Sequence, residues 1–299
     1  MVDVKQQLSA YAQRVEDVML TKLGAMEQNT GNLALGSLFD AMRHSLTAGG
    51  KRIRPALVYA FCQACGGKLE AADTAACAME MSHTASLIVD DLPALDNDDL
   101  RRGKPSCHKA FGEATAILAG YSLICAPFQW LTEDAVLSDA QKAALVHTLS
   151  SHEGACGMIG GELKDIHFET QEVVTLAELE SMCLAKTGDF MASSCEMGCI
   201  CGGGSEEQIR AAREFGMNVG LAFQIIDDIL DVTSTSELLG KPVGSDEEEG
   251  KKTFVTLMGI ENAKARAAEL TESAHAQLAA FADTDFLHAL TDALLVRVQ

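Results

Sequence analysis

The sequence predicts an all-α fold, a single large helical bundle formed by residues 1–299. Aromatic residues make up only 5% of the chain, while Ala, Leu, Met and Glu are abundant, a composition that favours helices over sheets. Apolar side chains recur at helical spacing, and no strand pattern or repeat of fixed period is convincing. The chain has five prolines and no Ser/Gly/Pro-rich linker, so we expect one domain.

Each predicted helix is bounded by turn-forming or polar residues. The first, over residues 4–28, ends at the polar run 29–32, and the second, over residues 34–47, ends at Gly49-Gly50. The further predicted helices cover residues 53–65, 70–92, 114–132, 139–150, 175–200 and 206–233, and helices between residues 254 and 297 complete the chain.

The segment from Ala114 to Thr132 contains no charged residue and is long enough to span a bilayer. However, Gly120, Pro127 and Gln129 interrupt it, and no basic flank orients it. We therefore expect a buried core helix here and no membrane span.

Charge and cysteine content narrow the class of protein. The net charge of −20, from 43 acidic and 23 basic residues, argues against a general nucleic-acid or anionic-membrane surface. The N-terminal residues 1–7 do not lead into the apolar core of a secretory signal. We expect a reduced, cytoplasmic protein in which the ten cysteines act as small buried hydrophobes. Cys62 and Cys65 lack a matching second pair, so a zinc site is not favoured.

An aspartate cluster in the helix over residues 206–233 carries the strongest chemical signal. Residues three and four apart share a helix face, so Asp227 and Asp228 can each present a carboxylate together with Asp231, with Gln224 one turn before them. Crowded carboxylates resist burial unless a cation neutralises them, and Mg²⁺ carrying a phosphorylated ligand is the simplest candidate. The turn-rich segment 240–253 is expected to form a loop that closes over the ligand.

A second cluster, Asp90, Asp91 and Asp96, lies at the end of the helix over residues 70–92. Asp90 and Asp96 would lie about 240° apart on an uninterrupted helix, so we expect the backbone to break near Pro93. Cations follow at once, at Arg101, Arg102 and Lys104. Two Asp-rich clusters, each accompanied by Arg or Lys, indicate two walls of one cleft that grips a diphosphate through metal ions.

A basic segment at the start of the helix over residues 53–65 is a candidate anion site. Lys51, Arg52 and Arg54 follow Gly49-Gly50, and the N–H groups of a helix N-terminus point outward there. A solvated basic turn is the alternative, because short basic runs are common.

Taken in order, these motifs resemble those of the trans-prenyl diphosphate synthases, most closely the bacterial farnesyl and plant-type geranylgeranyl diphosphate synthases. The matching segments are GGKRIRP at 49–55, DDLPALDNDDLRRGKP at 90–105, KTG at 186–188, FQIIDDILD at 223–231, and GKPVGSD with GKKT within 240–253. Each motif is moderately specific, whereas all of them in this order would rarely occur by chance. The resemblance covers most of the chain and implies an isoprenoid synthase bundle with a central apolar tunnel.

The resemblance also implies a role for each matching residue. Three Mg²⁺ ions would be bound by Asp90, Asp91, Asp96, Asp227, Asp228 and Asp231. The diphosphate of the allylic substrate would be clamped by Arg101, Lys186 and Lys241. The pocket for isopentenyl diphosphate would comprise Gly50, Lys51, Arg54, His83 and Arg102. Thr187 and Gln224 would lie near the developing allylic cation. The expected catalytic residues, all of which would also contact the substrate, are Arg101, Lys186, Thr187 and Gln224.

The implied activity is that of a prenyltransferase that acts on dimethylallyl or geranyl diphosphate. Magnesium and cationic side chains would neutralise the leaving pyrophosphate, and the allylic C–O bond would ionise. The double bond of isopentenyl diphosphate would then attack the cation, and a proton would be lost to the departing pyrophosphate. No nucleophilic side chain is needed, and an apolar tunnel must shield the cation from water. A homodimer is implied by the family.

Product length depends in this family on the residue five before the first aspartate, which is Ala85 here, with Ser86 beside it. Ala85 lies about 7.5 Å along the helix from Asp90, at 1.5 Å per residue. A small residue there permits a longer chain, and Met81, one turn deeper, is the alternative stop. We expect farnesyl diphosphate (C15), with geranylgeranyl diphosphate (C20) as the alternative.

Two departures from the family pattern and three rival interpretations remain. Val89 stands where close relatives often have His, and Glu162 where Gln is usual, so we expect altered tuning and not loss of activity. A class I terpene cyclase would not need the pocket formed by Lys51, Arg54 and His83. A non-catalytic partner subunit would be expected to lose one aspartate cluster. An acidic helical protein with incidental Asp runs would not pair cations with both clusters.

Overall fold

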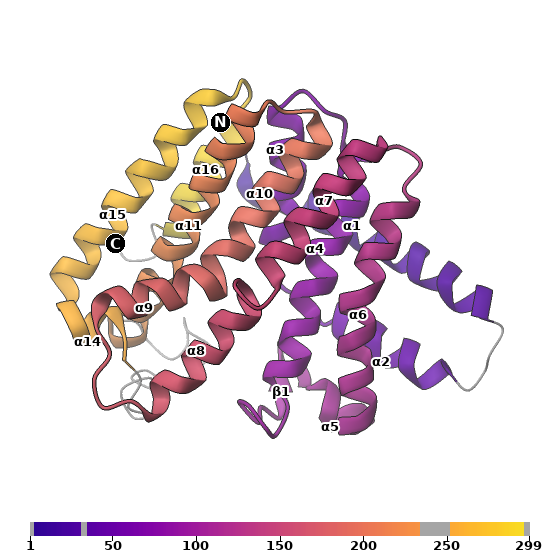
Figure 1. Ribbon diagram of the computed structural model, residues 1–299, viewed down its shortest axis with the longest axis horizontal. Helices are drawn as coiled ribbons and strands as arrows, with labels where there is room; N and C mark the ends of the chain where they lie inside the picture. Colours follow the sequence, from indigo (N-terminus) through magenta and orange to yellow (C-terminus); the bar gives the residue numbers. More distant parts are fainter. Residues whose placement is uncertain (1–2, 31–34, 234–251, 296–299) are drawn as a thin grey trace.

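The structure, a computed structural model, describes residues 3–30, 35–233 and 252–295, which form a bundle of helices (Figure 1). The predicted all-α fold is confirmed. In chain order the helices are α1 (Val4–Thr30), α2 (Gly36–Leu46), α3 (Ile53–Ala64), α4 (Leu69–Asp90), α5 (Cys107–Phe111), α6 (Glu113–Glu133), α7 (Asp139–Glu153), α8 (Met158–Thr170), α9 (Leu176–Cys183), α10 (Asp189–Gly202), α11 (Glu206–Thr233), α14 (Phe254–Met258), α15 (Ile260–Gln277) and α16 (Asp285–Leu295). A π-helical turn, η2 (Leu184–Gly188), joins α9 to α10, and a 3₁₀ turn, η3 (Leu278–Ala280), follows α15.

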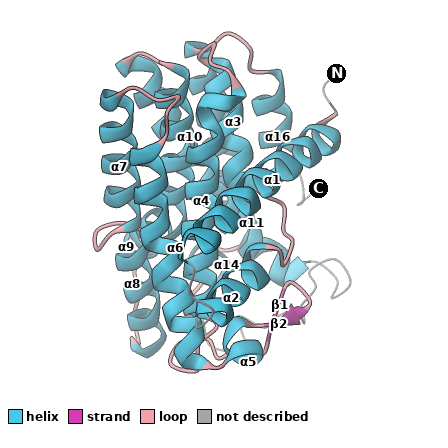
Figure 2. Ribbon diagram, turned by 90° about the vertical axis from the view of Figure 1, so that its right-hand side faces the viewer, coloured by secondary structure: helices cyan, strands magenta, loops and turns pink. Residues whose placement is uncertain are grey.

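Helices α3 and α10 lie at the centre of the bundle. In α10 every residue from Phe190 to Cys201 is buried, and α3 is buried from Pro55 to Cys62. Figures 1 and 2 show these two helices side by side, with α4, α7 and α11 packed against α10 and with α6 and α15 farther out. A helix that is apolar all round must be covered on every side, so the composition of α3 and α10 explains their position.

The structure contains three features that the sequence did not predict. Helix α8 (Met158–Thr170) was not predicted, and the helix expected over residues 175–200 is divided into α9, η2 and α10. The third feature is a short pair of strands, for which the sequence has no convincing pattern. A two-residue antiparallel hairpin pairs β1 (Leu100–Arg101) with β2 (Lys104–Pro105).

Helix α6 is only half covered, so the expectation of a buried core helix is corrected. Its length and composition would allow it to cross a membrane, and 44% of its apolar window is buried. Ala116, Ala119 and Leu123 face the core, whereas Leu118 and Tyr121 are 56% and 64% exposed. One apolar side of α6 therefore has no cover among the described residues.

All ten thiols are free, and seven of them are buried, in agreement with the expected role as small hydrophobes. Cys125 and Cys156 are exposed and Cys65 is half-buried, so the expectation does not hold for these three. The exposed Cys125 lies on α6. No group of three His, Cys, Asp or Glu side chains in the described ranges has the geometry of a formed metal site.

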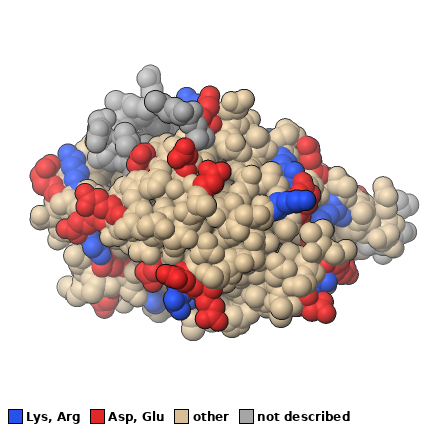
Figure 3. Space-filling view, turned by 90° about the horizontal axis from the view of Figure 1, so that it is seen from above, with Lys and Arg blue, Asp and Glu red and all other residues tan. Residues whose placement is uncertain are grey.

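The surface reflects the acidic composition. On the face shown in Figure 3, acidic and basic side chains gather toward the edges, and a wide central area carries few of either. The net charge of −20 makes each cluster of cations conspicuous.

Candidate active site

The backbone breaks immediately after α4, as predicted, and brings Asp96 back to Asp90. The N–H of Asp96 donates to the carbonyl oxygen of Asp90 at 2.9 Å, and the N–H groups of Leu95 and Asn97 both donate to the carbonyl of Leu92. The helix ends at Asp90, slightly earlier than expected, and Asn97 takes a positive φ of 53°. Two aspartates that an unbroken helix would separate therefore stand at the same end of α4.

Asp91 points to a different partner. It is buried and accepts a hydrogen bond from Nε of Arg101 at 2.8 Å, with a second contact from Nη2 of the same guanidinium. Nη2 also lies 3.2 Å from Asp98. Burial opposes the charge of Arg101, but its hydrogen bonds to Asp91 hold its pKa above the usual value. Asp91 therefore fixes Arg101, which occupies strand β1, beside the first aspartate cluster.

Lys186 is held by two carboxylates of α8. Its Nζ atom lies 2.6 Å from Oδ2 of Asp165 and 2.8 Å from Oε2 of Glu162, both on α8. Burial opposes the charge, yet these two carboxylates raise the pKa of Lys186, so it stays protonated. Helix α8 can approach so closely because Gly161 has no side chain, and a Cβ there would collide with the backbone of Lys186. Glu162, which the resemblance marks as a departure from the family pattern, is thus a direct partner of the lysine.

Asp90 has an unusual protonation equilibrium. Burial and the charge of Glu162 raise its pKa to about 7, with a smaller contribution from Asp96, while Lys186 and Arg101 lower it. A carboxyl group in such surroundings is short of positive charge, which a bound cation would supply.

Asp228 of the second aspartate cluster lines a small cavity of about 190 Å³ together with Lys186. Its lining includes Lys186, Thr187, Gln224 and Asp228. The hydroxyl of Thr187 donates to Oε1 of Gln224 at 3.1 Å, and Oδ2 of Asp228 accepts from the N–H of Phe254 at 2.7 Å. The residues expected to contact the allylic group are thus together, and Asp228 faces them.

A second group of cations surrounds the end of α2 and the start of α3. Nη1 of Arg54 lies 3.3 Å from Nε2 of His83, and Nε of Arg54 is buried without a hydrogen-bond partner among the described residues. Burial lowers the pKa of Arg54 to about 10. Burial and the neighbouring arginines lower the pKa of His83 well below its usual value, so the imidazole is neutral at pH 7. A buried guanidinium with an unpartnered N–H is a suitable ligand for an anion.

Gly50 and Arg102 complete this candidate anion site. Gly50 has a φ of +116°, and a Cβ there would stand 2.6 Å from the guanidinium carbon of Arg102. Arg102 donates to the carbonyl oxygen of Gly49. A glycine is required because of both its backbone conformation and this close approach. Nearby, Arg52, which the sequence placed in the candidate anion site, is buried and pairs with the buried Glu80, so its charge is already neutralised.

The donor chemistry of the aspartates fits a divalent metal such as Mg²⁺. That ion binds few carboxylates at a time and completes its octahedron with water and substrate phosphates, so a preformed cage of three carboxylates is not required. Asp90, with its pKa raised to about 7, and Asp228, which lines the cavity, are the donors that the geometry favours. Asp231 is buried, as is Asp91. Lys241, expected to contact the diphosphate, and most of the predicted loop 240–253 lie outside the described residues, and Lys51 is exposed.

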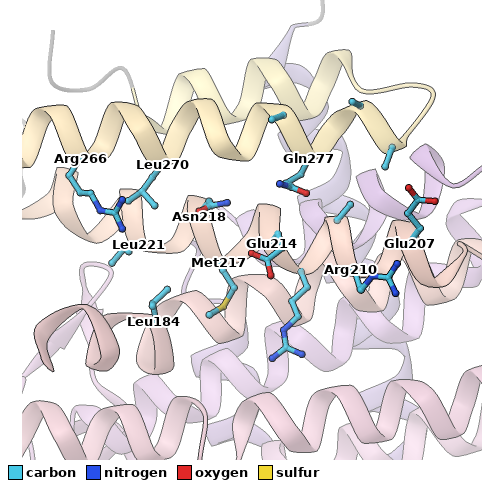
Figure 4. A pocket seen from close by; sticks show the side chains of 15 residues that line it. Leu184, Glu207, Arg210, Glu214, Met217, Asn218, Leu221, Arg266, Leu270 and Gln277 are labelled. Atoms are coloured by element: carbon cyan, nitrogen blue, oxygen red, sulfur yellow. The ribbon is translucent and has the colours of Figure 1, made fainter. Parts of the chain in front are cut away.

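A larger groove of about 1130 Å³ lies elsewhere, between α11 and α15 (Figure 4). It is lined by apolar side chains such as Leu184, Met217 and Leu270, with Arg210 and Arg266 among them. None of the clustered aspartates lines it, so it is separate from the candidate active site.

Comparison with known proteins agrees with this geometry. The sequence pattern of the family described as polyprenyl synthetase matches residues 36–288. The chain belongs to the polyprenyl synthetase family. It is 44% identical over 251 residues to geranylgeranyl pyrophosphate synthase 4 of Arabidopsis thaliana, a match that covers 83% of this chain and 67% of the relative. It is 43% identical over 262 residues to a dimethylallyltranstransferase of Fischerella ambigua, covering 87% of this chain and 76% of that protein.

Solved structures of polyprenyl synthetases share the fold. An FPP/GFPP synthase from Zymomonas mobilis aligns with a TM-score of 0.86 and 32% identity, over 98% of this chain and 99% of that one. A geranyltransferase from Legionella pneumophila aligns with a TM-score of 0.85 and 34% identity, over 98% and 97% of the two chains. The matched region spans about two thirds of the length of the plant relatives. As a member of this family the chain is a prenyltransferase of the trans-prenyl diphosphate synthase class.

Proposed function

We propose that this prenyltransferase condenses isopentenyl diphosphate with allylic diphosphates and releases geranylgeranyl diphosphate (C20) as its main product. The observation that supports the proposal is the surroundings of Lys186, whose charge acts on Asp90 and which lines one cavity with Thr187, Gln224 and Asp228. The C20 product replaces the C15 product expected from the sequence, because the plant relatives are named geranylgeranyl pyrophosphate synthases. Ala85, small and buried, agrees with a longer product.

The aspartate-rich side of the site binds the allylic substrate. Asp90, Asp96, Asp227 and Asp228 would hold the metal, with Asp91 and Asp231 supporting them from buried positions. When bound, the metal, which we propose to be Mg²⁺ with three ions per site, neutralises the charge that develops on the leaving diphosphate. Arg101 and Lys186 add fixed positive charge to the same group.

Lys186 can bind the substrate without losing its partners on α8. Its ammonium group is neutralised by Asp165 and Glu162 in the structure. An ammonium group has three N–H donors, so Lys186 can donate the third to a diphosphate oxygen while it keeps its contacts with Asp165 and Glu162 of α8. The hydroxyl of Thr187 and the amide of Gln224 then offer oxygen dipoles to the allylic cation.

The cation pocket of Lys51, Arg54, His83 and Arg102 would bind isopentenyl diphosphate. Arg54 offers its unpaired Nε, and the neutral His83 offers a ring nitrogen. Binding the second diphosphate away from the aspartates keeps two anions apart and leaves the double bond to face the allylic carbon. No protein nucleophile is required.

A homodimer is part of the proposal. Ile117, Leu118 and Tyr121 are exposed on one side of α6 and follow helical spacing. A contiguous apolar surface of this kind is usually covered in the working protein. A second copy of the chain, meeting it along α6, would cover it symmetrically.

Farnesyl diphosphate is the second candidate product, because the structural neighbours include an FPP/GFPP synthase and a geranyltransferase. The deciding experiment incubates the purified protein with Mg²⁺, isopentenyl diphosphate and dimethylallyl, geranyl or farnesyl diphosphate. Product alcohols are identified by chain length after dephosphorylation. Geranylgeraniol supports the proposal, farnesol alone supports the second candidate, and no elongation with any primer rejects both.

A further inference from the structure

His152 forms a buried bridge that the activity proposed above does not use. It lies in the last turn of α7 and is only 5% exposed. Its Nδ1 atom lies 3.1 Å from Oδ1 of Asp189, and its Nε2 atom lies 3.2 Å from Oε1 of Glu196. Both carboxylates belong to α10, seven residues apart, which places them on the same side of that helix.

This geometry determines the charge of the ring. A neutral imidazole has one N–H donor, but here both ring nitrogens face carboxylate oxygens, which only accept. Both contacts can be hydrogen bonds only if the ring is the imidazolium. Burial by itself would lower the pKa of His152, but the hydrogen bonds to Asp189 and Glu196 outweigh it and raise the pKa to about 9.

The charged groups around His152 come from three helices. On α10 they are Asp189 and Glu196, and on α11 Arg213 places its Nε 3.6 Å from Oε1 of Glu196. On α7 itself, Glu153 is buried, and burial raises its pKa to about 7, while Ser82 of α4 lowers it. At neutral pH His152 is therefore the cation that compensates Asp189, and Arg213 shares Glu196 with it.

Asp189 is the first residue of α10 and directly follows the π-helical turn η2, which carries Lys186 and Thr187. A π-helical turn is intrinsically less favourable than the α-helix around it, so its neighbours must hold it in place. The backbone of Lys186 packs against Gly161 of α8 on one side, and Gly188 packs against Gly220 of α11 on another. Asp189 follows the C-terminal end of η2. Its hydrogen bond with His152 therefore ties this end of the turn to α7.

We propose that His152 is a positioning residue for the prenyl transfer reaction, whose imidazolium holds the start of α10 and thereby sets the positions of Lys186 and Thr187. This inference rests on the proposed function, because it needs those two residues to act on the substrate. It adds a residue that none of the motifs contains. His152 itself does not touch the reacting atoms.

The test compares His152→Gln with Glu196→Gln and with the control His147→Gln, an exposed histidine of the same helix. His152→Gln removes the cation and the paired contacts, whereas Glu196→Gln leaves the Nδ1 contact with Asp189. We expect His152→Gln to remain folded by circular dichroism and to lose between about tenfold and about a hundredfold in kcat, the effect of a small misplacement of catalytic groups. The KM for isopentenyl diphosphate should change by less than about twofold, because its pocket lies on α3 and α4. Glu196→Gln and His147→Gln should keep kcat near the wild-type value.

The pH profile of kcat separates positioning from a purely structural role. In the wild type, kcat should fall as pH rises through about 9, where the imidazolium of His152 loses its proton. The same decline should be absent in His152→Gln. A His152→Gln protein that melts earlier but keeps the wild-type kcat and the wild-type profile would overturn the inference.

A misfolded variant and an inactive wild type are distinguished as follows. If His152→Gln does not fold, Asp189→Asn replaces it, because this change keeps the size of the side chain and weakens only the contact with the imidazolium. An unchanged kcat in Asp189→Asn rejects the inference. If the wild type itself does not elongate any primer, the proposed function has failed. If the wild type elongates and the variants match it, only the role of His152 has failed.

Discussion

The ammonium group of Lys186 lies 2.8 Å from the carboxylate of Glu162, and the charge of that same carboxylate raises the pKa of Asp90. One acidic side chain thus acts on a cation expected to bind the substrate and on an aspartate expected to bind the metal. A glutamine at this position would hydrogen-bond to Lys186 but would carry no charge.

Glu162→Gln should shift the acid limb of the pH–rate profile to lower pH. Asp90 is protonated below its pKa of about 7 and then binds a divalent cation poorly, so activity at limiting Mg²⁺ should decline as pH falls through that value. Removing the charge of Glu162 lowers the pKa of Asp90. The measurement is kcat/KM against pH at a fixed, subsaturating Mg²⁺ concentration, with Glu162→Asp as the matched control. An identical acid limb in both variants would show that Glu162 does not control this titration.

Asp227→Ala should reduce turnover by at least about a hundredfold, a loss typical of removing a group that stabilises charge in the transition state. Asp227 is half-buried near the end of the long helix α11, so the fold should survive and the melting temperature should change little. Asp139→Ala, at an exposed position at the start of α7, is the control. Near wild-type turnover in Asp227→Ala would contradict the assignment of the second aspartate cluster.

Ser86→Phe should shorten the product. Ser86 lies four residues before Asp90 on α4, on the same side of the helix, and is half-buried. Ala85 is fully buried, so a phenylalanine there would overpack the core and destabilise the fold. The measurement is the chain length of the dephosphorylated product, with Ser86→Ala as the control. A product distribution in Ser86→Phe equal to that of the wild type would place the end of the tunnel away from this side of α4.

Replacing Leu118 and Tyr121 together by glutamate should convert the proposed dimer into a monomer. Both side chains are exposed and apolar, and buried unpaired charges at their positions would oppose association. The mass in solution, measured by light scattering after size-exclusion chromatography, reports the change. Val173→Glu, which alters an exposed apolar residue in the loop before α9, is the control. A wild-type protein of monomer mass would reject the dimer.

Local patterns in the sequence predict much of the fold. The expected boundaries of the long helices agree with α1, α4, α6 and α11 to within a few residues. Helix α1 has a clear apolar period, α4 is rich in Ala and Met up to the aspartate cluster, and α6 is a long uncharged run. The break after Asp90 was also predicted, because an unbroken helix could not have brought Asp90 and Asp96 together.

Other features depend on contacts between distant segments. Helix α8 was not predicted from the sequence, because Gly160-Gly161 is typical of a turn. The structure shows why Gly161 occurs within a helix: a Cβ there would collide with the backbone of Lys186. The hairpin at residues 100–105 was missed because its strands are too short for a pattern. His152 and Asp189 are 37 residues apart, and no local spacing relates them, so the network they form could be found only in three dimensions.

Cys125 offers a way to follow assembly without mutation. It lies four residues after Tyr121 and seven after Leu118, on the same exposed side of α6, and the other fully exposed thiol, Cys156, lies in the connection between α7 and α8. A thiol-specific fluorophore should therefore label these two sites before the buried thiols. If a second copy covers α6, labelling of Cys125 should slow as the protein is concentrated while labelling of Cys156 provides the internal reference. Peptide mapping of the labelled chain would then yield an occupancy curve for the α6 surface and, from it, a dissociation constant.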